Sequence, residues 1–362
     1  MHIAIDARII NSSTGRYVER LLHYLQQVDT TNSYTILVRK KDKDFWKPSG
    51  KNFAVEVADF DNYSLGEQVG FKKFLDQLSP DLVHFCMPQQ PIGYRGKTVT
   101  TFHDLTLVKT YNSDKNWLVF HLKQQVGKWV FKKVARKSDH IIAISEYTKK
   151  DLQDFVDIPD EKMSVIYEAG ETTAGNTKPY KLPFKRYIMF VGQQSDYKNI
   201  KRLGDAHQKL LKEHPDLGLV LVGRKKAAEL KNEAYFIDKN YKNILFTDFV
   251  EDDELNWLYK HTEAYIFPSL MEGFGLPGLE AMSHGVPVVS SNATCLPEVY
   301  GDAAEYFNPL NTDDIAQTID AVLKSKPRQS ELTTAGYKRI KKFSWKKMAK
   351  ETHNVYMSVF NV

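Results

Sequence analysis

Short apolar runs alternate with amphipathic segments along most of the chain. In the first half, apolar runs of strand length lie at residues 2–7, 34–38, 53–57, 81–85, 98–102 and 140–144. Between several of them, apolar residues recur at helical spacing, as in the segment 18–25. Strands that alternate with helices predict a parallel sheet covered by helices on both faces. Such a sheet binds its ligands at the carboxyl ends of its strands.

A second alternating series follows an aperiodic stretch. Residues 171–185 are rich in Thr, Gly, Pro and Lys and have no apolar periodicity, so we expect a domain boundary there. Strands are then predicted at 187–191, 219–222, 244–246 and 264–267, with helices from Ile200 and Asp253. The pattern predicts an N-terminal domain over residues 1–175 and a C-terminal domain over residues 183–343. A cleft between two such domains is a common ligand site.

Composition narrows the class of protein. A chain of 362 residues with 42% hydrophobic residues fits two globular domains. The net charge of +5 is modest for this length, so we expect no nucleic-acid partner. No apolar run is long enough to span a bilayer and no secretory signal is evident, so the expected location is the cytoplasm. Cys86 and Cys295 are far apart in the sequence and are expected to be reduced, unpaired thiols.

One segment, residues 117–137, has an uneven charge distribution. Six cations alternate there with apolar residues that include Trp117, Phe120, Trp129 and Phe131. The pattern is typical of a basic amphipathic helix that rests on anionic lipid, which would place the protein at the inner face of the membrane. It is more often found in a surface helix with a buried apolar stripe and a solvated basic face. Both interpretations stay open at this stage.

The strand-end rule singles out a few polar residues in the first half. Gly15 and Arg16 follow the first strand, and His103 and Asp104 directly follow the strand at 98–102. A histidine taken alone is more often a hydrogen-bonded structural residue, but its position at a strand end favours a role in binding. Ser145 is expected only to cap the helix that follows it.

Asp59-Phe60-Asp61 spells the DxD pattern that some metal-dependent enzymes use. Three residues are weak evidence, and Asn62 follows directly. We interpret the segment as turn chemistry and assign no metal site to it.

The densest chemistry lies in residues 267–287, FPSLMEGFGLPGLEAMSHGVP. A strand ends at Phe267, and a helix is predicted from Pro277 to Ser283, with Gly285 just beyond its end. A glycine-containing loop that feeds a helix N-terminus offers backbone N–H groups and the positive end of the helix dipole to an anion such as phosphate. Phe274, Gly275 and Leu276 supply N–H groups there. Glu272 and Glu280 bracket the turn with seven residues between them.

This stretch, with PSL, GFGLP, EAM, GVPVV and LPEV in order, resembles the nucleotide-sugar site of retaining glycosyltransferases with the GT-B fold, and family four is the most similar group. The resemblance extends weakly over nearly the whole chain. It implies two Rossmann-like domains that face one another across a cleft, with residues 344–362 crossing back to the N-terminal domain as a helix.

The resemblance also implies roles for individual residues. Glu272 would hold hydroxyls of the donor sugar, Glu280 the ribose, and Lys198, from the Lys198-Asn199 pair, the diphosphate. Gly15 and His103, and less firmly Arg16 and Asp104, would approach donor and acceptor. Many relatives carry Arg where this chain has Gln193, so Arg224, after Gly223 at the end of the next strand, is a candidate replacement.

The expected activity is transfer of a hexose, with mannose favoured, from a nucleotide diphosphate sugar to a hydroxyl of a glycan or lipid-linked acceptor. The resemblance implies retention at the anomeric carbon and neither metal nor other cofactor. Three alternatives remain: a nucleotide-sugar epimerase of the same fold, a non-catalytic sugar-nucleotide-binding subunit, and a membrane scaffold that needs only the basic face of residues 117–137.

Overall fold

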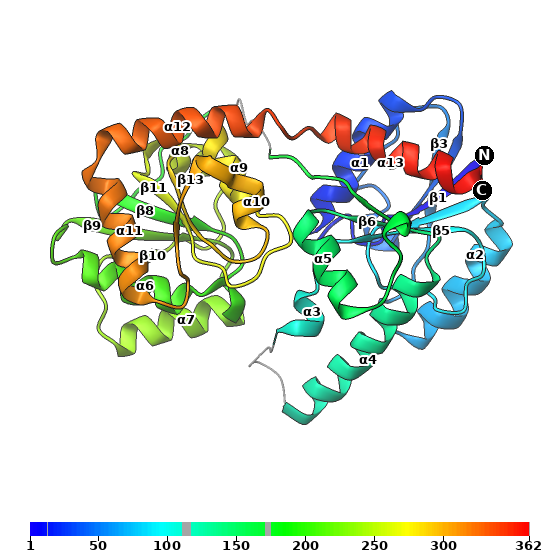
Figure 1. The fold of residues 1–362 in the computed structure, drawn as a ribbon, viewed down its shortest axis with the longest axis horizontal. Coiled ribbons are helices and arrows are strands. Elements are labelled where there is room, and N and C mark those ends of the chain that lie inside the picture. Colours follow the sequence, from blue (N-terminus) through cyan, green and yellow to red (C-terminus); the bar gives the residue numbers. More distant parts are fainter. Residues whose placement is uncertain (13, 111–116, 171–174, 362) are drawn as a thin grey trace. The chain divides into compact units, whose positions relative to one another are not determined.

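The computed structural model describes residues 1–12, 14–110, 117–170 and 175–361, and for residues 117–120 and 122 it describes the backbone only. The chain forms two compact units. The first unit comprises the described parts of Met1–Lys109, His121–Glu168 and Ser344–Val362, and the second those of Thr110–Phe120 and Ala169–Phe343. Figure 1 shows a sheet and its surrounding helices in each.

The first unit is built on a seven-stranded parallel sheet among its described residues, in the order β3-β2-β1-β4-β5-β6-β7. Its central strands are fully buried, as the apolar runs predicted. The strands are β1 (His2–Asp6), β2 (Ser33–Val38), β3 (Phe53–Val57), β4 (Leu82–Phe85), β5 (Thr98–Phe102), β6 (His140–Ala143) and β7 (Met163–Val165).

Helices and short helical turns connect these strands. They are α1 (Gly15–Val28), η1 (Lys40–Asp42), the π-helix η2 (Gly66–Phe71), α2 (Lys72–Leu78), α3 (Thr106–Lys109), α4 (Trp117–Lys137), α5 (Glu146–Phe155), η3 (Asp160–Lys162) and α13 (Trp345–Phe360). The predicted stripe Val18, Leu21, Leu22 and Leu25 is the buried face of α1. Ser145 caps α5 by accepting a hydrogen bond from the Thr148 N–H, as predicted.

The last helix of the chain, α13, packs against α1 of the first unit (Figure 1). His353 on α13 lies 3.0 Å from Asp29, which follows α1, and Lys97 donates a hydrogen bond to the Val359 carbonyl. Deeper in the unit, Tyr356 of α13 hydrogen-bonds His84 of β4 across 2.6 Å. Ionic and hydrogen-bond contacts therefore attach the C-terminal segment to the first unit.

The second unit holds a six-stranded parallel sheet among its described residues, in the order β10-β9-β8-β11-β12-β13. The strands are β8 (Arg186–Val191), β9 (Leu217–Val222), β10 (Ile244–Phe246), β11 (Ala264–Phe267), β12 (Val288–Ser291) and β13 (Ala304–Phe307). The connecting elements are η4 (Asp196–Lys198), α6 (Ile200–Leu210), α7 (Ala227–Asp238), α8 (Asp252–His261), α9 (Leu276–Ser283), α10 (Leu296–Tyr300), η5 (Gly301–Ala303), α11 (Thr312–Lys324) and α12 (Lys326–Ile340). The predicted fold class, two Rossmann-like parallel sheets, is confirmed.

In each sheet the chain reverses its direction of travel at one place. The order runs outward from β1 to β3 on one side and from β4 to β7 on the other, and likewise from β8 to β10 and from β11 to β13. The crevice at such a switch point, at the carboxyl ends of the strands, is where open α/β sheets bind ligands. Ligand sites are therefore expected between the ends of β1 and β4 and between the ends of β8 and β11.

Candidate functional site

The loops after β8 and β11 meet at the switch point of the second sheet. Lys198 ends η4 after β8, and Glu272 lies in the loop after β11. The Lys198 Nζ lies 2.6 Å from the Glu272 Oε1, and the two side chains are only 15% and 12% exposed. The two loops therefore place a close charged pair, largely shielded from water, at the ligand-binding edge of the sheet.

Asn199 fixes the backbone beside Lys198. Its φ of 62° lies in the left-handed region, which asparagine tolerates better than most residues. Its side-chain amide donates hydrogen bonds to the carbonyls of Pro268 and Pro309. The Lys198-Asn199 pair therefore serves two purposes: the asparagine anchors η4 to the loop after β11, and the lysine projects toward Glu272.

Gly275 shapes the turn into α9. Its φ is 94°, and a Cβ there would lie 2.6 Å from the Tyr300 hydroxyl oxygen, so only glycine fits. The same hydroxyl donates a 2.5 Å hydrogen bond to the Gly275 carbonyl. Helix α9 begins at Leu276, and Pro277 occupies its first turn. The predicted strand, glycine loop and helix N-terminus are all present, and the helix starts one residue earlier than expected.

Glu272 lies in the loop before α9 and Glu280 lies within that helix. Burial, followed by the charges of Glu272 and Glu280, raises the pKa of Tyr265 on β11 well above its usual value. Phe274, which lies between them in the sequence, buries its ring edge-on against Phe343.

Arg224 lies apart from the Lys198–Glu272 pair. Its guanidinium covers the ring of Phe249 at 4.6 Å from the centroid, and that ring is 60% exposed. These two side chains come from the loops after β9 and β10, so they extend the carboxyl edge of the sheet away from Glu272.

The first unit has its own polar cluster at the corresponding edge. A Cβ on Gly15 would lie 1.9 Å from the Ile10 carbonyl oxygen, so α1 can start at this point only with glycine. Two residues further along α1, the ring of Tyr17 contacts His103 edge-on at 4.8 Å between centroids. The structure therefore brings Gly15 and His103, which come from the first and fifth strands, into one neighbourhood.

His103 is held on both sides. Its Nε2 donates a 3.0 Å hydrogen bond to the Cys86 carbonyl, and its Nδ1 lies 3.3 Å from the Glu168 carboxylate. Both His103 and Glu168 are buried. Glu168 was not predicted from the sequence, because it lies 65 positions away and its segment, after a short strand, carries no motif.

The remaining sequence candidates lie in the first unit. Asp104 accepts a hydrogen bond from the Thr106 N–H, which starts α3, and Arg16 is exposed on α1. Asp59 accepts a bond from the Lys40 N–H, and Asp61 is paired with Arg39. Both carboxylates of the DxD pattern therefore bind residues that are distant in the sequence, 19 and 22 positions away. Among the described residues, no group of three or more His, Cys, Asp or Glu side chains is arranged to hold a metal ion.

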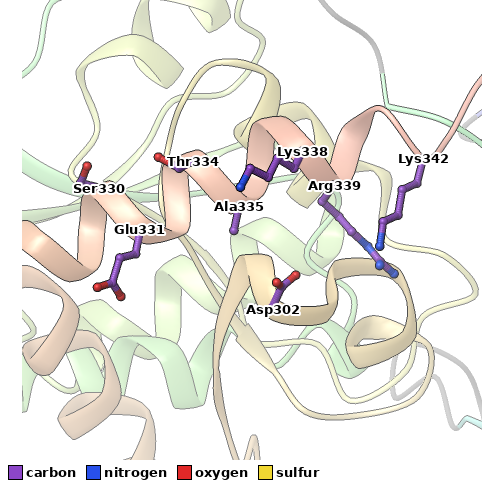
Figure 2. Close-up of a pocket in the computed structure, with 8 residues that line it drawn as sticks. All are labelled: Asp302, Ser330, Glu331, Thr334, Ala335, Lys338, Arg339 and Lys342. Atoms are coloured by element: carbon purple, nitrogen blue, oxygen red, sulfur yellow. The ribbon is translucent and has the colours of Figure 1, made fainter.

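A hollow of about 480 Å³ in the second unit lies elsewhere (Figure 2). It is lined by Asp302 of η5, by residues of α12 that include Lys338 and Arg339, and by Lys342, which follows that helix. η5 precedes β13, so the hollow lies toward the amino ends of the strands, opposite the ligand-binding edge. Arg339 donates to the carbonyls of Glu298 and Val299, and cations at a helix C-terminus are expected from the dipole. Arg339, which lines the hollow, therefore has a structural role, because it binds carbonyl groups of α10.

Two family models match the chain. The model described as "Glycosyltransferase Family 4" matches residues 14–169, and the model described as "Glycosyl transferases group 1" matches residues 178–339. The first match covers Gly15 and His103, and the second covers Lys198, Glu272 and Glu280.

Individual relatives agree with these matches. The chain is 28% identical over 274 residues to the O-antigen chain mannosyltransferase B of Escherichia coli, covering 72% of this chain and 70% of that protein. It is 30% identical over 269 residues to the serotype-specific mannosyltransferase WbdA of Escherichia coli, covering 69% of this chain but only 32% of WbdA.

Solved structures resemble this chain over its full length. Sucrose-phosphate synthase from Thermosynechococcus elongatus superposes with a TM-score of 0.79 at 17% identity and covers 100% of this chain and 99% of its own. Anabaena HepE, solved in complex with UDP and glucose, gives a TM-score of 0.74 at 15% identity, with 99% of both chains covered. At these identities the likeness concerns the fold.

Proposed function

The chain belongs to the family 4 glycosyltransferases, and on this premise we propose that it transfers mannose from a nucleoside diphosphate donor to a hydroxyl group of a glycan or lipid-linked acceptor. Membership of the family accounts for glycosyl transfer. Mannose is proposed because the relatives O-antigen chain mannosyltransferase B and WbdA carry that activity in their names.

The observation that carries the proposal is the contact between Lys198 and Glu272 in front of α9. A diphosphate bound near the N-terminus of α9 would meet the positive end of the helix dipole and the Lys198 ammonium group. Glu272, 2.6 Å from that ammonium group, would then be beside the sugar attached to the second phosphate and would accept bonds from its hydroxyls. Glu280 is proposed to hold the ribose.

We propose that transfer proceeds with retention. The bond between the anomeric carbon and the phosphate oxygen breaks, and the acceptor oxygen bonds to the anomeric carbon on the same face. The acceptor proton passes to the departing phosphate. Negative charge grows on that phosphate, and Lys198 together with the backbone N–H groups at the start of α9 would stabilise it. In this scheme the protein supplies the cation, and neither metal nor other cofactor takes part.

We propose that the first unit binds the acceptor. Gly15 lets the backbone at Ile10 pack closely against the start of α1, and His103 follows β5. We propose that donor and acceptor groups approach the edge that these two residues share. Because both ring nitrogens of His103 face acceptor atoms of the protein, we propose that the ring orients the site as a fixed group. Asp104 and Arg16 stand at the same edge.

A peripheral contact with an anionic membrane is part of the proposal. On α4, Val126 and Trp129 are 61% and 53% exposed, although both are apolar. They share the outer surface with the exposed cations Lys123, Lys132 and Lys133, whereas Val130, Phe131 and Val134 are buried in the core. An outward tryptophan among lysines fits a negatively charged lipid surface. Trp117, Leu118 and Phe120, which belong to the same sequence pattern, lie outside the described side chains.

No described helix has the length and apolar character needed to cross a membrane. The proposed contact is therefore carried by the surface of α4, and the proposed location is peripheral at the inner face of the membrane.

We predict that Glu272→Ala abolishes most transfer while the protein stays folded, because a loop carboxylate that binds donor hydroxyls contributes to positioning more than to packing. Turnover with nucleoside diphosphate mannose and the melting temperature should be measured together. Glu251→Ala, which changes an exposed glutamate before α8, is the matched control. Near-normal turnover in a well-folded Glu272→Ala protein would remove Glu272 from the site.

The donor can be identified by thermal shift. A ligand that binds only the native state raises the melting temperature by mass action, so a panel of nucleoside diphosphates and their mannose and glucose esters should give the largest rise with the true donor. Incubation of that donor with and without a glycan acceptor then distinguishes transfer from other reactions of the sugar. A panel without any shift would contradict the proposal.

A further inference from the structure

The loop that carries Glu272 is held by the loop after the neighbouring strand. β12 lies beside β11 in the sheet, so their following loops leave the same edge side by side. The Glu272 N–H donates a 3.2 Å hydrogen bond to the Thr294 hydroxyl oxygen. The Cys295 thiol donates a 3.3 Å hydrogen bond to the Glu272 carbonyl. Two consecutive side chains thus bind both backbone groups of Glu272.

Thr294 adopts a backbone conformation that its side chain disfavours. Its φ is 55°, in the left-handed region where glycine and asparagine are common and β-branched residues are rare outliers. Strain of this kind persists where the surrounding structure enforces it, and it concentrates at functional sites. Here the strained residue is the one whose hydroxyl receives the Glu272 N–H.

Cys295 is suited to remain a donor. Its side chain is fully buried. Burial, and then the charges of Glu272 and Glu298, raise the pKa of the thiol well above its usual value. The sulfur therefore keeps its proton over the working pH range, and the S–H···O contact to Glu272 persists.

The Glu272 side chain depends on this support. A loop residue whose N–H and C=O are both bound has little backbone freedom, so its carboxylate stays aimed at Lys198. Gly275, three residues further on, is tied to Tyr300 in the same way. Residues 294–300 thus form a second layer behind the donor loop.

We propose that Thr294 and Cys295 are positioning residues that fix the backbone of Glu272 for donor-sugar recognition, and that the strain at Thr294 is retained for this purpose. The inference rests on the proposed role of Glu272. In this proposal both residues act on the sugar only through Glu272. Their loss should affect the sugar part of the donor and spare the diphosphate part, which Lys198 and α9 would bind.

Thr294→Gly separates positioning from stability, because it relieves the backbone strain and deletes the hydroxyl. We expect an unchanged or higher melting temperature, together with kcat lower by about tenfold or more, since small displacements at a reacting centre have large effects. The affinity for the nucleoside diphosphate without sugar should stay within about twofold of the native value. A tenfold loss of affinity, which corresponds to about 1.4 kcal/mol of binding free energy, would lie well outside this range. Thr294→Ser keeps the hydroxyl and should restore most of the lost kcat.

Two comparisons control the experiment. Ser79→Gly relieves another left-handed residue, φ 47°, at the end of α2, and should raise stability without changing kcat. Hydrogen exchange at the Glu272 amide reports the positioning directly, without turnover, and should be faster in Thr294→Gly and close to native in Thr294→Ser.

The outcomes distinguish this inference from the proposed function. If Glu272→Ala is inactive but Thr294→Gly keeps full kcat and slow exchange at Glu272, the positioning role is overturned and the function stands. If Glu272→Ala is itself fully active, the proposed function of Glu272 fails first. If Thr294→Gly weakens nucleoside diphosphate binding as much as transfer, the loop has a general structural role and the inference is wrong.

Discussion

Lys198 and Glu272 are direct partners at the proposed donor site. The ammonium group of Lys198 lies 2.6 Å from the Glu272 carboxylate, which compensates its charge. A bound diphosphate would offer at least two negative charges to the same ammonium group. In the proposed function, donor binding therefore exchanges one partner of Lys198 for another and releases Glu272 toward the sugar hydroxyls.

Lys198→Ala should weaken binding of the diphosphate while leaving that of the nucleoside nearly unchanged, because the lost charge acts on phosphate. Titrations with nucleoside, monophosphate and diphosphate measure this, and the loss should grow with each phosphate. Lys201→Ala, which removes a neighbouring lysine that faces Tyr235 instead, is the matched control. Equal losses for all three ligands would contradict the assignment.

Residues that support the site from a distance could not be predicted from the sequence. The residue type of Asn199, which follows the predicted lysine, does indicate its conformation, since asparagine often adopts the left-handed region. Thr294 carries the opposite signal, because a β-branched residue is the last one expected at φ 55°. Its hydrogen bond to Glu272 spans 22 positions, and such contacts depend on which strands are neighbours in the sheet.

At the scale of elements, the alternation of apolar runs predicted the sheets well. The strands at residues 53–57, 98–102, 244–246 and 264–267 have the predicted bounds. The other predicted strands differ by one or two residues at their ends, where local patterns are weakest. β12 and β13 were not assigned from the sequence, although Val286, Val288 and Val289 are apolar; the segment was interpreted only as part of a motif. Strand order itself follows from the tertiary packing and is not encoded in any local pattern.

Helix α4 combines the two sequence interpretations of its segment. Phe131, Val130 and Val134 pack into the core, as an ordinary surface helix requires. Trp129 points outward, and the Lys133 ammonium group lies 6.0 Å from its ring centroid. Lys137 has turned inward to the carbonyls of Pro91 and Ile92, and burial lowers its pKa to about 8. The outer surface thus keeps fewer cations than the sequence pattern alone implies.

We expect the protein to sediment with anionic vesicles at low salt and to release them at high salt, since each cation near the surface contributes on the order of 1 kcal/mol before screening. The triple change of Lys128, Lys132 and Lys133 to Glu should abolish this binding while the protein stays folded. Trp129→Ala should weaken it by removing apolar insertion.

The matched control for the vesicle experiment is the triple change of Lys346, Lys347 and Lys350 to Glu on α13. These exposed lysines belong to the same unit and alter the net charge equally. If both triple variants lose binding to the same degree, net charge explains the association and α4 is not the contact surface. Equal binding to neutral vesicles would also contradict the proposal.

At the scale of the whole molecule, each unit contains a buried neutral histidine. In the first unit, burial and then the charge of His103 lower the pKa of His84 to about 3, and its ring bonds Tyr356 and Thr101. In the second unit, burial lowers the pKa of His207 to about 4, and its Nε2 donates to the Leu217 carbonyl. Protonation of either ring is therefore disfavoured in the folded state.

The coupling between proton binding and folding defines the pH range in which these histidines affect stability. An unfolded histidine titrates near 6.5, so between about pH 6.5 and pH 4 the unfolded chain binds protons that the folded units do not. The stability due to these residues is fully present above pH 6.5 and is lost as the pH falls toward their folded pKa values. Asp29, whose pKa is lowered to about 2 mainly by hydrogen bonds from Tyr34 and Asn32 that outweigh its burial, adds a further loss only below pH 4.

We therefore predict that the free energy of unfolding is nearly constant from pH 8 to pH 7 and decreases from pH 6.5 to pH 4.5 in both units. His207→Gln removes the titrating group from the second unit and retains a side-chain donor for the Leu217 carbonyl. It should lower the stability of the second unit at pH 7.5 but flatten the decrease in its free energy of unfolding with falling pH, and the first unit should be unaffected.

Hydrogen exchange at pH 7.5 and pH 5.0, compared between peptides from β1–β5 and β8–β12, measures each unit separately. The first unit then serves as an internal control, because its His84 is unchanged. An acid-dependent loss in the second unit that is as steep in His207→Gln as in the native protein would show that other groups control its stability in acid.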